Sequence, residues 1–254
     1  MGNVLRKNAG RVAVICAYNH RNCGMYSVDL AANYFMTSLG VDFTLFIAHQ
    51  KKEREGRPWG RLRYEKLVDL RQLDNYDLIV FWGDFINNPA YGYEDFPNRE
   101  LAWGLVASRE QAYEKWKNIF LLKGYEKRQR VISVSNNFQN ILPFLRSVDA
   151  SARDAILDAY RTRFDQIFPR DGSSFRNMLI AAPELEGKVV QGVDAAFLLN
   201  QSEIYPSLGD VSESNTFAYY FSRSKLSNVH YMLFRLWRRT GFRPVNVRNW
   251  LKMD

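Results

Sequence analysis

Small, amide and charged residues follow several short apolar runs of the sequence, in places where side chains could act on a ligand. They are Asn22, Gly24, Gly83, Asp84, Ser135, Asn136, Arg170, Asp171 and Asp194. If the apolar runs are parallel strands, their carboxyl ends meet at one edge of a sheet, which is where open α/β sheets bind their ligands. We therefore predict that these residues contact a small-molecule substrate at this edge.

Arg170 and Asp84 are the candidates for a catalytic role. The guanidinium of Arg170 precedes the expected start of a helix, where it could bind a phosphate or a carboxylate through two parallel hydrogen bonds. The alternative is a structural ion pair between Arg170 and Asp171, with Ser173 or Ser174 as the N-cap of the helix. Asp84 follows a strand and a glycine, where its carboxylate could accept a proton from a sugar hydroxyl or could form an Asx turn.

The loop that contains Asn22 and Gly24 precedes another expected helix. Backbone N–H groups and the positive end of the helix dipole could bind an anionic group there, although a single glycine is equally typical of a tight turn. The two cysteines, Cys16 and Cys23, match no zinc or redox spacing, and the three histidines form no metal-ligand motif. We therefore expect no metal site, no cofactor and no covalent nucleophile of the hydrolase type.

Strand-like and helix-like segments alternate along the chain. We predict strands at residues 11–18, 42–48, 76–82, 131–135, 166–168 and 189–193. Between them we predict a helix that ends at Leu39 before Gly40, a helix that begins near residue 173, and helices at 64–73, 99–122 and 151–164, the last capped by Ser151. Because parallel strands need crossover connections, this alternation favours an α/β fold with a mostly parallel sheet and helices on both faces.

The composition is that of a folded protein rather than a disordered or membrane-spanning one. The chain has 254 residues, of which 46% are hydrophobic and 24% are charged. Its apolar runs are too short to span a bilayer, and its N-terminus lacks the apolar region of a secretory signal. We therefore expect a cytoplasmic protein, with peripheral attachment to a membrane as a second possibility.

The C-terminal part differs from the rest in composition and charge. We predict a first domain at 1–200, a linker at 201–216, and at 217–254 the start of a second α/β unit that remains incomplete. This unit would contain strands near its two ends and a helix at 227–240. Between residues 215 and 254 there are eight basic residues and one acidic residue, in a chain whose net charge is +8. A solvated helix face accounts for these charges better than nucleic acid, an anionic membrane or a phosphorylated substrate.

Five short motifs, taken in order, resemble the polysaccharide pyruvyl transferase family. They are the Asn-Cys-Gly loop at 22–24 and residues 76–84, 168–174, 193–199 and 221–224. The resemblance implies two Rossmann-like domains, similar to the GT-B fold of glycosyltransferases, with this chain supplying the N-terminal half. It also implies transfer of a pyruvyl group from phosphoenolpyruvate to two hydroxyls of a saccharide, in polysaccharide biosynthesis. On this interpretation Arg170 holds the anionic donor and Asp84 removes hydroxyl protons.

The expected partners follow from that resemblance. They are a saccharide or lipid-linked glycan as acceptor and an anionic small molecule, phosphoenolpyruvate, as the donor substrate. A nucleotide-sugar glycosyltransferase would use the same kind of sheet edge and is an alternative. Another alternative is a binding or assembly protein without catalysis, whose second unit packs against another copy of the chain or a partner chain. Nucleic-acid binding is disfavoured, because basic charge alone specifies no partner.

Overall fold

The structure is a computed structural model. It describes residues 10–16, 23–48, 62–126, 129–201, 216–219 and 243–246. The chain divides into two compact units: the first contains a six-stranded sheet and its helices, and the second contains a pair of short strands. Most of the predicted linker and the helix predicted at 227–240 lie outside the described residues.

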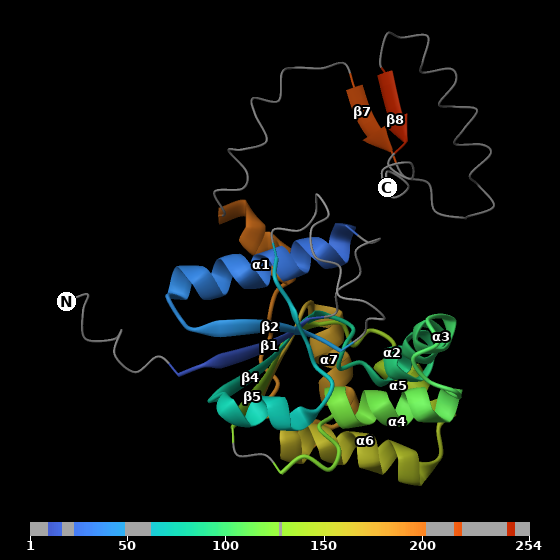
Figure 1. Cartoon of the computed structure of the whole chain (residues 1–254). Helices are drawn as coiled ribbons and strands as arrows, with labels where there is room; N and C mark the ends of the chain where they lie inside the picture. The colour runs from blue at the N-terminus through green and yellow to red at the C-terminus, as the bar shows by residue number, and fades with distance from the viewer. Residues whose placement is uncertain are drawn as a thin grey trace. The chain divides into compact units, whose positions relative to one another are not determined.

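Six parallel strands form the sheet of the first unit (Figure 1). They are β1 (Val12–Cys16), β2 (Phe43–Ile47), β3 (Glu65–Lys66), β4 (Leu78–Asp84), β5 (Arg130–Asn136) and β6 (Gln166–Pro169). Their order across the sheet, β3-β2-β1-β4-β5-β6, is the order found in dinucleotide-binding Rossmann folds. The predicted α/β class with a parallel sheet is therefore confirmed. The direction of winding reverses between β1 and β4, which is the point where such sheets open to ligands.

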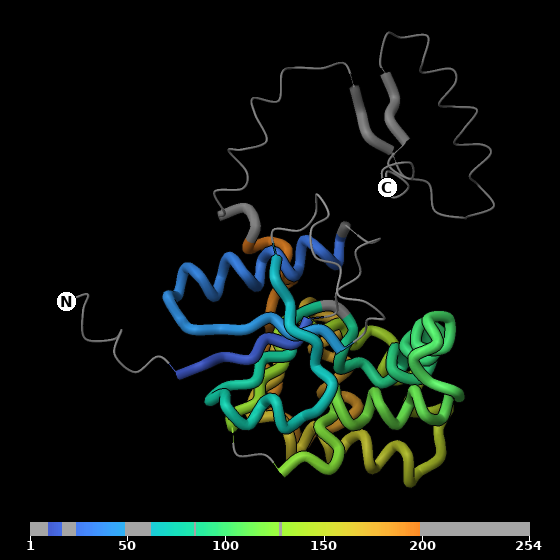
Figure 2. The backbone as a smooth tube through the Cα atoms, viewed as in Figure 1, coloured from blue at the N-terminus to red at the C-terminus, as the bar shows by residue number. Residues whose placement is uncertain are grey.

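Helices cover both faces of this sheet, and Figure 2 traces the backbone that connects them. The α-helices are α1 (Cys23–Leu39), α2 (Pro89–Tyr93), α3 (Asp95–Ala102), α4 (Arg109–Phe120), α5 (Ile141–Ser147), α6 (Ala150–Arg163) and α7 (Gly172–Ala181). The 3-10 helices are η1 (Leu70–Asn75), η2 (Pro183–Leu185) and η3 (Ala195–Gln201). In the second unit, β7 (Thr216–Tyr219) pairs in parallel with β8 (Arg243–Asn246), where strands were predicted.

An apolar core lies on each face of the sheet. On one face Val28, Ala32 and Met36 of α1 belong to the same cluster as Val14 and Val80 of the central strands. The core of the other face, beneath α4 and α6, is strongly aromatic, and its fully buried rings include Phe81, Phe96, Trp116, Phe120, Phe138, Tyr160 and Phe164. Because both faces are covered, every residue of β1 is buried. The rigid sheet that results fixes the positions of the strand ends.

Gly83 of β4 lies in close contact with Val28 of α1. A Cβ atom on Gly83 would lie 2.2 Å from Cγ1 of Val28, and the φ angle of Gly83 is +78°. One residue earlier, the indole N–H of Trp82 donates to the backbone oxygen of Val28 at 2.9 Å. Gly83 therefore serves the packing of helix on strand, because only glycine combines this φ with the absence of a side chain.

The helix predicted at 99–122 is wrong, because the structure has two helices there, α3 and α4. Gly104 adopts a φ of +64°, a conformation that ends an α-helix. Ser108 then caps α4, and its hydroxyl accepts a hydrogen bond from the N–H of Gln111 at 3.3 Å. The turn-rich segment before α3 also contains a helix, α2, which is capped by Asn88.

The helix predicted at 64–73 is also wrong in type and position. The N–H of Leu67 donates to the backbone oxygen of Ile47 at 2.9 Å, so the chain continues along β2 as the edge strand β3. A helical turn starts only after Asp69, which forms a capping box with Gln72. The result is a 3-10 helix at residues 70–75.

Three smaller predictions also need correction. The helix α6 is capped by Asp149 rather than Ser151, and α7 is capped by Asp171 rather than by Ser173 or Ser174. Residues 189–193 are not a strand of the sheet, since only Val189 forms isolated bridges. This segment nevertheless runs beside β6, because the N–H of Gly192 donates to the oxygen of Pro169 at 3.1 Å.

Candidate functional site

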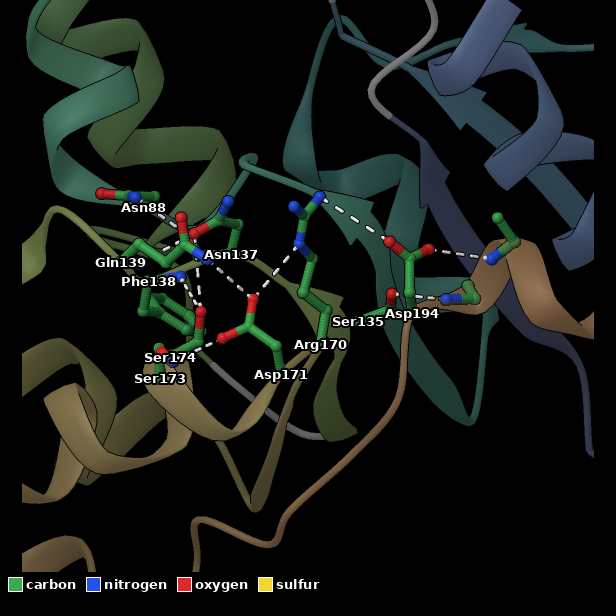
Figure 3. Close-up of polar contacts among 12 residues, drawn as sticks. Asn88, Ser135, Asn137, Phe138, Gln139, Arg170, Asp171, Ser173, Ser174 and Asp194 are labelled. Atoms are coloured by element: carbon green, nitrogen blue, oxygen red, sulfur yellow. Dashed lines mark hydrogen bonds and ion pairs between the residues drawn. The ribbon is translucent and has the colours of Figure 1, made fainter.

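The ends of β5 and β6 and the segment that returns beside them bring five of the predicted site residues together. They are Ser135, Asn136, Arg170, Asp171 and Asp194. Figure 3 labels four of them, all except Asn136. The N–H of Arg170 donates to the oxygen of Asn136 at 3.1 Å, which joins the two strand ends. The N–H of Ala195 donates to Oγ of Ser135 at 2.7 Å, which holds the start of η3 at the same edge. We refer to Arg170, Asp171 and Asp194 as the rim triad.

Arg170 lies between the other two members of the rim triad. Its Nε is 3.5 Å from Oδ2 of Asp171, and its Nη1 is 3.8 Å from Oδ2 of Asp194. The three side chains are 29%, 31% and 36% exposed, so water reaches all of them. The ion pair proposed between Arg170 and Asp171 as an alternative to an anion clamp is therefore present, and a second carboxylate, which sequence reasoning did not pair with Arg170, adds to it.

Asp171 has a structural task in addition to its ion pair. Its Oδ1 accepts the N–H of Ser174 at 2.7 Å and so caps α7, while Oδ2 accepts a hydrogen bond from Nε2 of Gln139 at 3.2 Å. Burial opposes ionisation of this carboxyl, but the hydrogen bonds from Ser174 and the neighbouring Arg170 outweigh it and lower the pKa of Asp171 below its ordinary value. The positive end of α7 is thus already occupied by a carboxylate of the protein itself.

Asp194 performs a similar task at the start of η3. Its Oδ1 accepts the N–H of Ala196 at 3.0 Å, and its backbone oxygen accepts the N–H of Phe197 at 3.1 Å. The side chain of Phe197 is 68% exposed and that of Val193 is 62% exposed. An aromatic ring and an aliphatic side chain therefore lie next to the carboxylate in sequence, within one turn of it, and face solvent.

Ser135 adopts an unusual backbone conformation. Its φ is +59°, and the register between β5 and β6 shifts between Val134 and Asn136. Such a conformation is costly for a residue with a side chain and persists where the surroundings enforce it. Here it forms a bulge at the strand end. The hydroxyl of Ser135 accepts the N–H that anchors η3, so the bulge helps to position Asp194.

A buried network of amide side chains is linked to the rim triad through the backbone of Asn136. Asn136 is fully buried; its Nδ2 donates to Oγ of Ser133 at 3.0 Å, and its Oδ1 accepts the N–H of Asn87 at 3.1 Å. Nδ2 of Asn88 donates to the oxygen of Asn137 at 2.8 Å. These bonds tie the loop after β4 to the end of β5. Asn136 therefore acts through its internal bonds. The sequence analysis does not predict its partners; for Asn87 the signal is the pair of Asn-Asn dipeptides at 87–88 and 136–137.

The remaining predicted residues lie at other places. Asp84 ends β4, and its backbone is in register with Asn136 at the same edge of the sheet. Gly83 is accounted for by its packing against α1. Gly24 is exposed in the first turn of α1, and Asn22 lies outside the described residues. Within the described ranges no three His, Cys, Asp or Glu residues are grouped to bind a metal ion, and the histidines fall outside those ranges.

The charges of the rim triad bear on what it can bind. An anion in contact with the guanidinium of Arg170 would also lie near Asp171 and Asp194. At about 4 Å and an effective dielectric constant of about 20, each unit pair interacts by about 4 kcal/mol. The two carboxylates therefore offset part of the attraction of the guanidinium for an anion. Hydroxyl groups, which both donate and accept, suit it better.

A comparison with solved structures finds a protein of similar fold. A solved structure described as an α-glucosyltransferase in complex with UDP and a 13-mer DNA containing a central A:G mismatch matches with a TM-score of 0.51 and 13% identity. The match covers 93% of this chain but only 55% of the other, so the chain spans about half the length of that enzyme. No family model matches the sequence. No curated protein matches it either.

The likeness to a glucosyltransferase concerns the fold. It confirms the predicted class: a Rossmann-like unit of the kind that forms one half of a two-domain GT-B glycosyltransferase. The resemblance to pyruvyl transferases and the roles predicted for Arg170 and Asp84 stay predictions. In the part of the chain that the structure describes, no helix is both long and apolar enough to cross a bilayer.

Proposed function

We propose that this chain belongs to a transferase that acts on a saccharide and that its first unit binds the saccharide at the ends of β5 and β6. The observation that supports the proposal best is the rim triad on a Rossmann sheet similar to that of a glucosyltransferase. Two carboxylates and a guanidinium, each about one-third exposed, can accept from and donate to the hydroxyls of a sugar. Asp84, at the end of the adjacent strand, is the candidate base for a sugar hydroxyl.

The donor that fits this fold most directly is a nucleotide sugar. The solved glucosyltransferase was captured with UDP, and its sheet resembles the one described here. In an open α/β sheet the carboxyl edge at the reversal of strand order, between β1 and β4, is the usual place for a ligand. The proposed reaction is transfer of a glycosyl group from such a donor to an acceptor hydroxyl.

A second candidate reaction is pyruvyl transfer from phosphoenolpyruvate. It is favoured by the five ordered motifs at residues 22–24, 76–84, 168–174, 193–199 and 221–224. Phosphoenolpyruvate is highly anionic, and the described rim triad contains two carboxylates and one guanidinium. In this reaction, therefore, basic residues outside the triad would bind the donor, and the triad would face the saccharide.

The two reactions are separated by testing donors one at a time. The full chain is incubated with a mixture of glycan acceptors and either UDP-glucose or phosphoenolpyruvate, and mass spectrometry detects an acceptor heavier by a hexose or by a pyruvyl ketal. In parallel, thermal unfolding is followed with each donor, since a ligand that binds the folded state raises the Tm. The proposal is supported if the unmodified chain forms product, Asp84→Asn forms none and Asp154→Asn still forms it. Neither product nor stabilisation with any donor, including other nucleotide sugars, contradicts it.

A further inference from the structure

Two groups of the rim triad lie near each other without a direct hydrogen bond. Nη1 of Arg170 and Oδ2 of Asp194 are 3.8 Å apart, which is beyond hydrogen-bonding distance although the charges are opposite. The other carboxylate oxygen of Asp194 already accepts the N–H of Ala196. A group inserted beside this pair can therefore accept from the guanidinium and donate to Oδ2 at the same time.

A hydroxyl group has this dual character without carrying a charge. It has one donor and two acceptor lone pairs, whereas an ionised carboxylate can only accept. A phosphate carries at least one negative charge at neutral pH, so even where it keeps a P–OH donor, the carboxylates of Asp171 and Asp194 would repel it. The helix starts on either side, which elsewhere attract anions, are capped by the same two carboxylates.

An exposed aromatic side chain lies one turn along the chain from this pair. Phe197 is 68% exposed, and the hydrogen bond from its N–H to the oxygen of Asp194 closes a single turn between the two residues. This turn keeps the backbone of Phe197 close to that of Asp194, at the start of η3. Val193, 62% exposed, precedes Asp194. Exposed aromatic side chains beside polar groups suit the mixed surface of a sugar ring.

We propose that Arg170, Asp194 and Phe197 form a subsite for an uncharged vicinal diol on a sugar ring, and that it discriminates against phosphate and carboxylate groups. This inference rests on the proposed function in that it assigns the ligand of the same sheet edge. One hydroxyl of the diol bridges Nη1 of Arg170 and Oδ2 of Asp194, its neighbour contacts the remaining guanidinium donors, and the ring lies on Phe197. The anionic part of any donor binds elsewhere.

The test measures diol and anion binding in the same protein. Saturation-transfer difference NMR of the full chain is recorded with uridine, which offers a ribose diol, and with maltotriose, which offers pyranose diols. Inorganic phosphate is titrated separately, followed by chemical shifts and by the Tm. The variant is Asp194→Asn, which keeps the size of the side chain and removes its charge. The matched control is Asp154→Asn, because Asp154 also lies 3.8 Å from an arginine, Arg153, but on α6.

The two ligand classes should respond in opposite directions. Asp194→Asn should weaken binding of the diol about tenfold or more, the usual effect of losing a hydrogen bond to a charged group. It should also increase stabilisation by phosphate, because one repulsive charge near Arg170 is gone. If Asp194 had a purely structural role, the variant would not bind the diol more weakly and phosphate more strongly at the same time. Phe197→Ala, a change at an exposed side chain, should weaken only the diol and serves if Asp194→Asn does not fold.

Other results would overturn the subsite. They are no saturation transfer to either sugar, equal effects of the Asp194 and Asp154 variants, or binding of phosphate by the unmodified chain that Arg170→Lys abolishes. A response with uridine alone identifies a nucleoside as the source of the diol, and a response with maltotriose alone identifies a glycan. If diol binding follows these predictions but no group transfer is found, the proposed function fails while the subsite stands.

Discussion

The contact between Gly83 and Val28 predicts a large loss of stability in Gly83→Ala. Two effects add. An alanine at a φ of +78° costs about 1–2 kcal/mol, of which about 0.4–1 kcal/mol is offset because alanine restricts the unfolded chain. The new Cβ would lie 2.2 Å from Cγ1 of Val28, and such overpacking costs about 1–3 kcal/mol more. The expected decrease in the free energy of unfolding is therefore about 1–5 kcal/mol, and the middle of the ranges gives about 3 kcal/mol.

Gly40 provides the matched control. Its φ is +65°, yet no heavy atom lies within 4 Å of the position that a Cβ would occupy. Gly40→Ala should therefore show the backbone cost alone, about 1 kcal/mol or less. With an m-value of about 2 kcal/mol per molar urea, the midpoints should fall by about 1–2 M for Gly83→Ala and by about 0.5 M or less for Gly40→Ala. Trp82 and Trp116, both buried in this unit, report the transition by fluorescence.

A double-mutant cycle separates the clash from other effects. Val28→Ala removes the methyl group that the new Cβ would meet, so the double variant should lose about 1–3 kcal/mol less than the sum of the single variants. Equal midpoints for Gly83→Ala and Gly40→Ala, or strict additivity with Val28→Ala, would show that α1 and β4 are not in the close contact described here.

Three further predictions concern buried and capping groups. Burial, and to a lesser extent the charge of Asp29, raises the pKa of Cys16 well above its ordinary value. The unfolded chain therefore loses this proton first, and stability should decline as the pH rises above about 8.5. Urea unfolding of Cys16→Ala should show a smaller decline. The pKa of Asp171 is lowered, so its contribution is complete above about pH 4 and is lost on acidification; Asp171→Ala should cost about 1 kcal/mol at pH 7, with a smaller difference from the unmodified chain at pH 3. The buried hydroxyl of Tyr160 donates to the oxygen of Asn87 at 2.6 Å, so Tyr160→Phe should reduce the free energy of unfolding by about 1–3 kcal/mol.

The central strands could be predicted because burial on both faces leaves a continuous apolar run. All five residues of β1 are buried, as are Ile79 to Trp82 in β4, and neither run contains a charge. Edge strand β3 has only two residues, Glu65 and Lys66, and no apolar run marks it. Its existence depends on the neighbouring strand β2 and not on its own sequence.

The division between α3 and α4 shows the weight of local signals for helix ends. The single helix predicted at 99–122 took no account of Gly104 and Ser108. Both were visible signals: a glycine suited to a positive φ, and a Ser-x-x-Gln sequence at 108–111 that forms the cap of α4. These local signals correctly mark the end of α3 and the start of α4.

The sequence indicates at which edge of the sheet the candidate residues lie, but not which side chains pair with one another. Residue types at the ends of β5 and β6 pointed to the edge where Arg170 and Asp171 lie, and those two are adjacent in sequence. The approach of Asp194 to Arg170 depends on the segment at 189–194 running back beside β6, through bonds between backbone groups far apart in sequence. The link between Ser133 and Asn87, 46 residues apart, is equally a product of the folded sheet.

The central position of β1 in the sheet has a consequence for folding during synthesis on the ribosome. Of the strands that the structure describes, β1 is synthesised first, yet it pairs with β2 on one side and with β4 on the other. The last residue of β4 lies about 70 positions after β1, and at about 5–20 residues per second the nascent chain needs several seconds to supply it. Until β4 is available, the edge of Val12–Cys16 that pairs with β4 in the folded protein has no partner. We therefore expect nascent chains stalled between β2 and β4 to be held by chaperones and to be cleaved readily by proteases, and chains stalled well beyond β4 to have lost both properties.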